Sequence, residues 1–145
     1  MKNMLILFLV LGLLQSCNKN SENDFDESKY QWYEIEVTAT AYNSFKNQTN
    51  SNPNITAFGD SLYPGLPYIA VSRDLYRKGL RRDTPIKING FDSIYWVKDR
   101  MHSRWQNRID IYMGVDLKAA REWGRRRVKI QYGIIIPDST KKTDK

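Results

Sequence analysis

Cysteine and histidine are almost absent from this sequence, and their scarcity excludes several kinds of chemistry. The 145 residues include one cysteine, Cys17, and one histidine, His102. A single cysteine cannot form an intrachain disulfide. With one histidine and scattered carboxylates, the sequence has no spacing typical of a metal site, and we expect neither a metal nor another cofactor.

Long apolar runs are limited to one, near the start of the chain. Lys2 precedes Met4–Leu14, an apolar stretch of eleven residues. This stretch is too short for a transmembrane helix and has the length of a signal-peptide core. The residues that follow, Leu14-Gln15-Ser16-Cys17, resemble a bacterial lipobox, in which the cysteine is lipidated and becomes the first mature residue. We therefore expect a signal peptide over residues 1–16 and a lipid at Cys17. The alternative is a plain secretory signal with an incidental cysteine.

Acidic residues are fewer than basic ones, 16 against 23, which gives a net charge of +7. A basic domain can bind nucleic acid, an anionic membrane surface or an acidic polymer. Export to the cell envelope argues against nucleic acid. Residues 17–30 are polar and predict a flexible, lipid-anchored tether, because they cannot bury enough apolar surface to fold. Asn18 after the cysteine is consistent with an outer-membrane site that faces the periplasm.

The rest of the chain predicts one small, mainly β domain over residues 31–137, followed by a charged tail over 138–145. Alternating or β-branched segments predict six strands, at Trp32–Tyr42, Tyr68–Ser72, Ile86–Ile88, Ser93–Lys98, Arg108–Met113 and Arg125–Tyr132. Short helices are expected at Arg73–Gly79, with Ser72 as its cap, and at Asp116–Gly124. Asn89-Gly90 predicts a hairpin turn. Six short strands with one or two short helices suit a closed β-barrel.

Two aspartates, Asp99 and Asp110, lie eleven positions apart among these strands. Strict alternation puts Asp110 and Tyr112 on the strand face opposite Ile109 and Ile111. Asp99 follows an apolar run and is expected at the edge between a strand and a loop. Two carboxylates held in this way can perform acid/base chemistry on a sugar. The alternative is that both are ordinary surface aspartates.

Several segments, taken in order, resemble the 3D (three-aspartate) domain. This double-psi β-barrel of the RlpA-like superfamily occurs in lytic transglycosylases of the MltA type and in other peptidoglycan-cleaving proteins. The matching segments are Val37–Tyr42, Ile55–Ala57, Ile69–Val71, Ile86–Gly90, Asp99, Arg108–Tyr112 and Ala120–Val128. Two departures stand out. Ser72 occupies the place of the family's first aspartate, and Arg100–Asn107 replaces a glycine-rich loop.

The resemblance implies a role for each matched residue. Asp110 corresponds to the catalytic acid/base and Asp99 to the aspartate that supports it, while Asp74 is the candidate to replace the aspartate missing at Ser72. The substrate-binding candidates are Thr40, Tyr42, Thr56 and Tyr112, together with His102 from the altered loop.

The implied activity is that of a lytic transglycosylase. Such an enzyme cleaves the β-1,4 bond between N-acetylmuramic acid and N-acetylglucosamine in peptidoglycan strands without water. The alternative is a non-catalytic lipoprotein that binds peptidoglycan or organises the envelope, and an inhibitor or partner-binding lipoprotein is a weaker third possibility.

Overall fold

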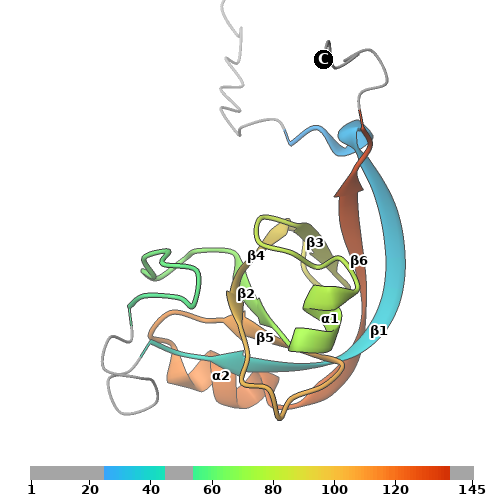
Figure 1. Ribbon diagram of the computed structural model, residues 1–145. Coiled ribbons are helices and arrows are strands. Elements are labelled where there is room, and N and C mark those ends of the chain that lie inside the picture. Colours follow the sequence, from blue (N-terminus) through green and yellow to red (C-terminus); the bar gives the residue numbers. More distant parts are fainter. Residues whose placement is uncertain (1–24, 45–53, 138–145) are drawn as a thin grey trace, which may run out of the picture.

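Six strands close into a barrel in the order β1-β5-β2-β4-β3-β6 (Figure 1). The computed structural model describes residues 25–44 and 54–137. The strands are β1 (Tyr30–Tyr42), β2 (Tyr68–Val71), β3 (Pro85–Ile88), β4 (Tyr95–Arg100), β5 (Arg108–Tyr112) and β6 (Arg126–Ile135). The helices are α1 (Arg73–Arg77), α2 (Leu117–Trp123) and the 3-10 turn η1 (Glu27–Lys29). The predicted mainly β barrel with six strands and two short helices is confirmed.

Strands that are distant in the sequence lie side by side in the barrel. β1 pairs in parallel with β5, and β2 pairs in parallel with β4. The remaining four pairs are antiparallel. As a result, β2 lies between β4 and β5 and is hydrogen-bonded to both. This arrangement brings the two strands that carry Asp99 and Asp110 onto either side of β2.

Aliphatic side chains fill the interior of the barrel. Ile69, Val97, Ile109 and Ile111 have no exposed surface, and alternation along each strand points them to the same side. Burial of such side chains stabilises the fold by about 1.5–3 kcal/mol each. The predicted inward face of β5 is therefore confirmed. The outward Tyr112 is also buried, with 4% of its surface exposed, because other side chains cover this part of the outer wall.

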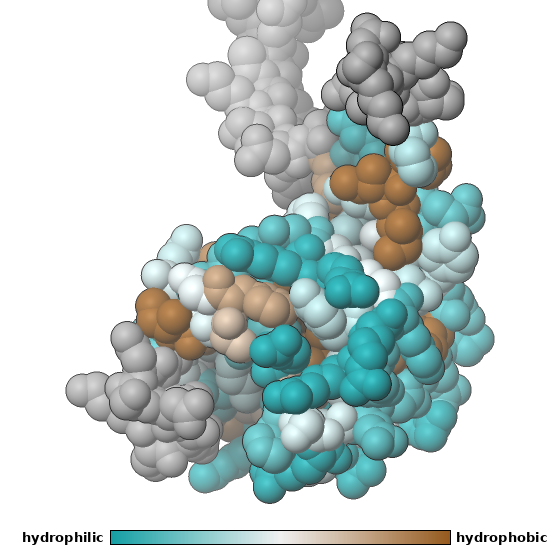
Figure 2. All heavy atoms as spheres, viewed as in Figure 1, coloured by the Kyte–Doolittle hydropathy of each residue, from teal (hydrophilic) through white to brown (hydrophobic). Residues whose placement is uncertain are grey.

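β1 and β6 form a long antiparallel ribbon that extends past the barrel (Figure 1). Its outer end exposes Ile135 and Ile136, and Figure 2 shows hydrophobic surface there. Phe25, which the sequence analysis placed in the tether, stacks on Tyr30 with ring centroids 5.2 Å apart and meets Trp96 edge-on at 5.5 Å. Phe25 is therefore part of the folded domain and not of a free tether, because its aromatic ring is packed against the barrel wall.

Several predictions lie outside the described residues. They are the signal peptide over residues 1–16, the lipid at Cys17, the first part of the tether and the tail over 138–145. Within the described ranges, the structure contains no helix with the length and apolar character needed to span a membrane.

Candidate functional site

Asp99 and Asp110 lie on the outer face of the barrel, on either side of Ala70. Ala70 of β2 is in register with Asp110 of β5 and with Asp99 of β4, and Thr40 of β1 is in register with Asp110 from the other side. Residues in register on neighbouring strands project to the same face of a sheet. These four residues therefore form one row across four strands, which we call the aspartate row. The backbones of the two aspartates are roughly 10 Å apart, since neighbouring strands are about 4.8 Å apart.

A β-bulge in β4 is what places Asp99 in the aspartate row. Ile69 pairs with Val97, but the next residue, Ala70, pairs with Asp99, so that Lys98 is the extra residue. Strict alternation from the buried Val97 would have brought Lys98 into register with Ala70. The strand was expected to end at Lys98 with Asp99 at its edge, whereas β4 includes Asp99 and continues to Arg100. Bulges that re-aim a side chain are common next to active sites.

Asp110 is a largely buried carboxyl with one hydrogen-bond donor. The Thr40 hydroxyl donates to its Oδ1 at 2.8 Å. Burial raises the pKa of Asp110 to about 6, against the opposing effects of the Thr40 hydrogen bond and the positive charge of Arg108; the negative charge of Asp99 raises it further. Asp110 thus retains its proton for part of the time near neutral pH, as a general acid requires.

Asp99 anchors a neighbouring loop. Its Oδ1 accepts hydrogen bonds from the backbone N–H groups of Ala57 at 2.8 Å and Arg100 at 2.7 Å. Burial raises the pKa of Asp99 despite these hydrogen bonds and the charge of Arg100. One oxygen of Asp99 therefore binds backbone N–H groups, and the negative charge of Asp99 raises the pKa of Asp110.

A cleft of about 240 Å³ opens over the aspartate row. It is lined by Tyr42, Asn43, Ala70, Asp99, Arg100, Met101, His102, Trp105 and Asp110. The methyl group of Ala70 lies in register between the two carboxylates, and a larger side chain would occupy the space between them. The structure thus brings together four of the predicted residues, Asp99, Asp110, Tyr42 and His102, while Thr40 supports Asp110 from the adjoining strand.

Tyr42 supplies an unpaired polar group to this cleft. Its hydroxyl oxygen is buried and has no hydrogen-bond partner among the described residues. Burial raises the pKa of Tyr42, and the negative charges of Asp99 and Asp110 raise it further. Tyr42 therefore stays protonated, and its hydroxyl proton is not used by any of the described residues.

Tyr112 does not line the cleft, in contrast to its predicted substrate-binding role. Its ring packs on that of Tyr42 with centroids 5.3 Å apart, and its hydroxyl is 2.9 Å from the Ser44 hydroxyl. Only 4% of the surface of Tyr112 is exposed. Tyr112 therefore supports the ring of Tyr42 and does not face the cleft.

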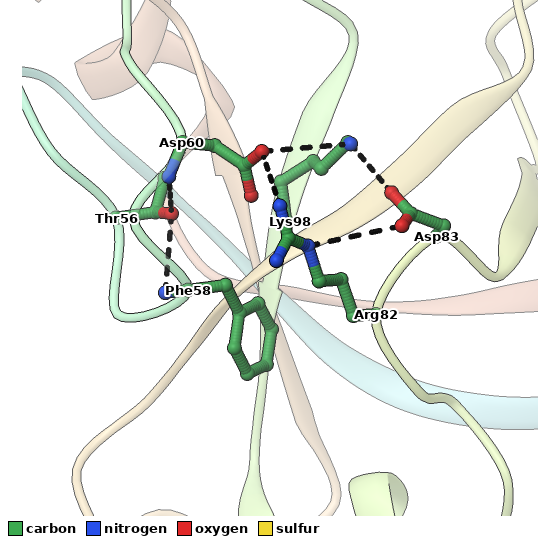
Figure 3. A network of polar contacts seen from close by, with 6 residues as sticks. All are labelled: Thr56, Phe58, Asp60, Arg82, Asp83 and Lys98. Carbon is green, nitrogen blue, oxygen red and sulfur yellow. Dashed lines mark hydrogen bonds and ion pairs between the residues drawn. The ribbon is translucent and has the colours of Figure 1, made fainter.

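Thr56 is also outside the cleft, because its hydroxyl is used within its own loop. Its Oγ1 accepts hydrogen bonds from the backbone N–H groups of Phe58 at 3.3 Å and Asp60 at 3.0 Å. Asp60 in turn forms ion pairs with Arg82 at 2.8 Å and Lys98 at 3.7 Å (Figure 3). These contacts hold the loop against β4, so Thr56 stabilises the loop that Asp99 binds.

Asp74 does not reach the cleft either. It lies on α1, and its Oδ2 accepts a hydrogen bond from the backbone N–H of Asn107 at 2.9 Å. Burial raises the pKa of Asp74, but hydrogen bonds from the Ser72 hydroxyl and from backbone N–H groups outweigh this effect and lower it overall. Ser72 is the N-cap residue of α1, as predicted, but its hydroxyl makes no capping hydrogen bond to the helix and instead accepts from the backbone N–H of Arg108 at 3.1 Å. Ser72 and Asp74 thus hold the start of β5.

The cleft also contains residues that were not among the predicted site residues. Arg100, Met101 and Trp105 come from the end of β4 and the loop after it. The predicted His102 lies in the same loop, where its Nδ1 accepts a hydrogen bond from the backbone N–H of Arg104 at 3.3 Å. Asn43 is buried beneath the rim, where its side chain donates to three backbone carbonyls. Nothing in the local sequence distinguishes Asn43 as a residue of the site.

A larger cavity of about 610 Å³ lies along β3 and β6, on another part of the surface. It is lined mainly by charged and amide side chains, and two of its lysines already have carboxylate partners. Lys87 pairs with Glu27 at 2.5 Å and Lys129 with Glu34 at 3.1 Å. None of the predicted site residues lies there. The smaller cleft, with its buried acid and unpaired hydroxyl, is therefore the better candidate for chemistry.

No protein-family model and no curated protein matches the chain. Among solved structures, the apo form of an expansin from Clavibacter michiganensis is similar, with a TM-score of 0.42, 20% identity and coverage of 74% of this chain and 53% of that one. A mutant of a Clavibacter michiganensis expansin in complex with cellohexaose gives a TM-score of 0.42, 19% identity and coverage of 77% and 54%. The chain spans about half the length of these structures.

The raised pKa of Asp110 predicts a stability difference for Asp110→Asn that depends on pH. Because the folded protein holds this proton more tightly than the unfolded chain, ionisation lowers the stability of the wild type as the pH rises from about 4 to about 6. Asn carries no such cost. We expect the free energy of unfolding of Asp110→Asn to gain about 3 kcal/mol on the wild type between pH 4 and pH 8, at 1.36 kcal/mol for each pKa unit.

Urea unfolding of both proteins across this pH range measures the difference. Asp74→Asn is the matched control, because the pKa of Asp74 is lowered and the trend should reverse. A difference between Asp110→Asn and wild type that stays constant with pH would contradict the raised pKa.

Proposed function

We propose that the cleft cleaves peptidoglycan glycan strands as a lytic transglycosylase, with Asp110 as its acid and base. The proposal rests on a largely buried carboxyl with a pKa of about 6, in an open cleft and separated by one strand, β2, from a second carboxylate. A carboxyl with this pKa can donate a proton near neutral pH and can also take one back. An ordinary surface aspartate, with its pKa near 3.8, is ionised and could only accept one.

The reaction needs one group that plays both parts. Asp110 donates its proton to the glycosidic oxygen as the bond from that oxygen to C1 of the muramoyl residue breaks. The carboxylate of Asp110 then removes the proton from the C6 hydroxyl of the same sugar, whose oxygen attacks C1 and closes a 1,6-anhydro ring. The proton that left the acid is thus recovered, and no water is consumed.

Neighbouring side chains have distinct roles in this proposal. Thr40 orients Asp110 through its 2.8 Å hydrogen bond. Asp99 helps to keep Asp110 protonated, and its negative charge stabilises the positive charge that develops on the sugar ring in an oxocarbenium-like transition state. Tyr42 donates its unpaired hydroxyl to a sugar oxygen. The rim residue His102 is within the same cleft and contacts the glycan.

The proposed setting is the cell envelope, with the protein held by a lipid on Cys17 in the outer membrane facing the periplasm. The N-terminal apolar run and the lipobox-like residues support this. Phe25, where the described structure begins, is eight residues after Cys17, a span of about 28 Å at full extension. An anchored barrel would therefore work on glycan close to its membrane.

Digestion of purified peptidoglycan by residues 18–145, with products identified by mass, tests the proposal. We expect anhydro-muropeptides from the wild type and at least 100-fold less from Asp110→Asn, because general acid–base groups contribute about 10²–10⁴-fold. Asp74→Asn should retain its activity within a few-fold, because Asp74 does not line the cleft. Products with reducing ends would instead indicate a hydrolase, and equal products from Asp110→Asn would exclude Asp110 as the acid.

A second candidate function, peptidoglycan binding without cleavage, is favoured by a basic surface beside the cleft. The residues Arg73, Arg77, Lys78, Arg81 and Arg100 are exposed and form no ion pair among the described residues. The guanidinium groups of Arg81 and Arg100 lie 4.9 and 6.0 Å from the ring centre of Tyr76, which connects α1 to the cleft. Stem-peptide carboxylates of peptidoglycan fit such a surface.

This surface predicts salt-dependent binding of Asp110→Asn to intact sacculi, measured by co-sedimentation. Adding Arg73→Gln and Arg77→Gln should weaken binding several-fold at low salt and have little effect at high salt, because exposed charges are screened. Lys118→Gln with Arg121→Gln on α2 is the matched control and should leave binding unchanged. Equal losses from both pairs would indicate that only the net charge matters.

A further inference from the structure

Arg108 is a buried cation beside the proposed acid, yet it is held against an aromatic ring. Its guanidinium carbon lies 3.8 Å from the ring centre of Trp105, and only 8% of the residue is exposed. Asp110 is two positions along the same strand, so both side chains leave the same face of β5. Within the part of the chain that the structure describes, Arg108 nevertheless forms no ion pair with a carboxylate.

Two groups therefore compete for this guanidinium. A cation over the face of a tryptophan gains about 0.5–2 kcal/mol, and more as it loses water. Asp110 is roughly 7 Å away along the strand, within reach of an arginine side chain, and offers an ionised partner as soon as it loses its proton. If Arg108 moved onto Asp110, the carboxylate would be stabilised and its pKa would fall by about 1–3.

We infer that Trp105 is a positioning residue that stacks on Arg108 and so keeps this cation from pairing with Asp110. The inference rests on the proposed role of Asp110 and adds to it the device that leaves the acid unpaired. Trp105 comes from the loop between β4 and β5 and brings its indole ring against Arg108.

Among residues 25–44 and 54–137, few other charged or titratable groups surround Asp110. β1 contributes the hydroxyl of Thr40, which donates to Asp110, and the hydroxyl of Tyr42. β4 contributes Asp99, whose negative charge raises the pKa of Asp110, whereas the positive charge of Arg108 lowers it. The cleft rim adds Arg100 and His102.

Two further arginines lie near the Arg108–Trp105 pair, and neither contributes to the pKa shift of Asp110. Arg104 lies 4.9 Å from the Trp105 ring centre and is exposed, and the charge of Arg125 acts on Arg108. Of all these groups, Arg108 is the cation whose charge opposes the raised pKa of Asp110.

Titration of the Asp110 carboxyl by ¹³C NMR, in residues 18–145, tests the inference without any need for activity. Residues 25–137 contain the whole closed barrel and its core, so this fragment retains the site. In Trp105→Ala we expect the pKa of Asp110 to fall by about 1 or more, as an opposite charge within about 6 Å requires. Trp105→Phe keeps a ring for Arg108 and should leave the pKa close to that of the wild type.

A double-mutant cycle separates the effect of Arg108 from simple opening of the cleft to water. Arg108→Met removes the cation, and in this background Trp105→Ala should no longer lower the pKa of Asp110 by as much. Should Trp105→Ala fail to fold, Trp105→Leu keeps apolar cover without a ring for Arg108 and provides the same comparison.

Either of two results would overturn the inference. One is an unchanged or higher pKa of Asp110 in Trp105→Ala, and the other is an equal fall with and without Arg108. A chain that releases no anhydro-muropeptides but shows the predicted cycle would refute the proposed activity and leave the role of Trp105 intact.

Discussion

The register between three strands is the constraint on which the site depends. β2 pairs with β5 on one side and with β4 on the other, and a single residue, Ala70, is opposite an aspartate in both pairings. The parallel pairing of β2 with β4 requires a long crossover, and the bulge at Lys98 corrects the register by one residue. Without that one-residue correction, a lysine would take the place of Asp99 beside Ala70.

The position of Asp110 in the aspartate row lowers the stability of the folded protein when this carboxyl is ionised. A carboxyl that is largely removed from water is less stable when ionised, and among the described residues Asp110 receives one side-chain hydrogen bond in return, from the Thr40 hydroxyl. The surrounding contacts offset this cost. Asp99 fixes one loop through Ala57, Asp74 fixes another through Asn107, and the barrel interior is filled by aliphatic side chains. These contacts thus hold the strands and loops around Asp110 in place.

Local patterns in the sequence predicted the elements of this fold but only part of its site. Alternation identified the buried face of β5, and therefore the side on which Asp110 lies. The bulge at Lys98 has no local signal, so Asp99 was expected one step outside its strand. Thr56 and Asp74 carry the right groups for a site, but each hydroxyl or carboxylate is used by a backbone N–H that folding brings to it. Such partners come from tertiary contacts, which sequence spacing does not report.

The proposed role of Asp110 depends above all on its protonation in the wild-type protein, which can be measured directly. The carboxyl carbons of the aspartates can be followed by NMR as the pH is changed. We expect Asp110 to titrate with a pKa of about 6, well above that of Asp74. A pKa of Asp110 near the ordinary value of 3.8 would contradict the proposed role, because a carboxylate that is already ionised at neutral pH has no proton to donate.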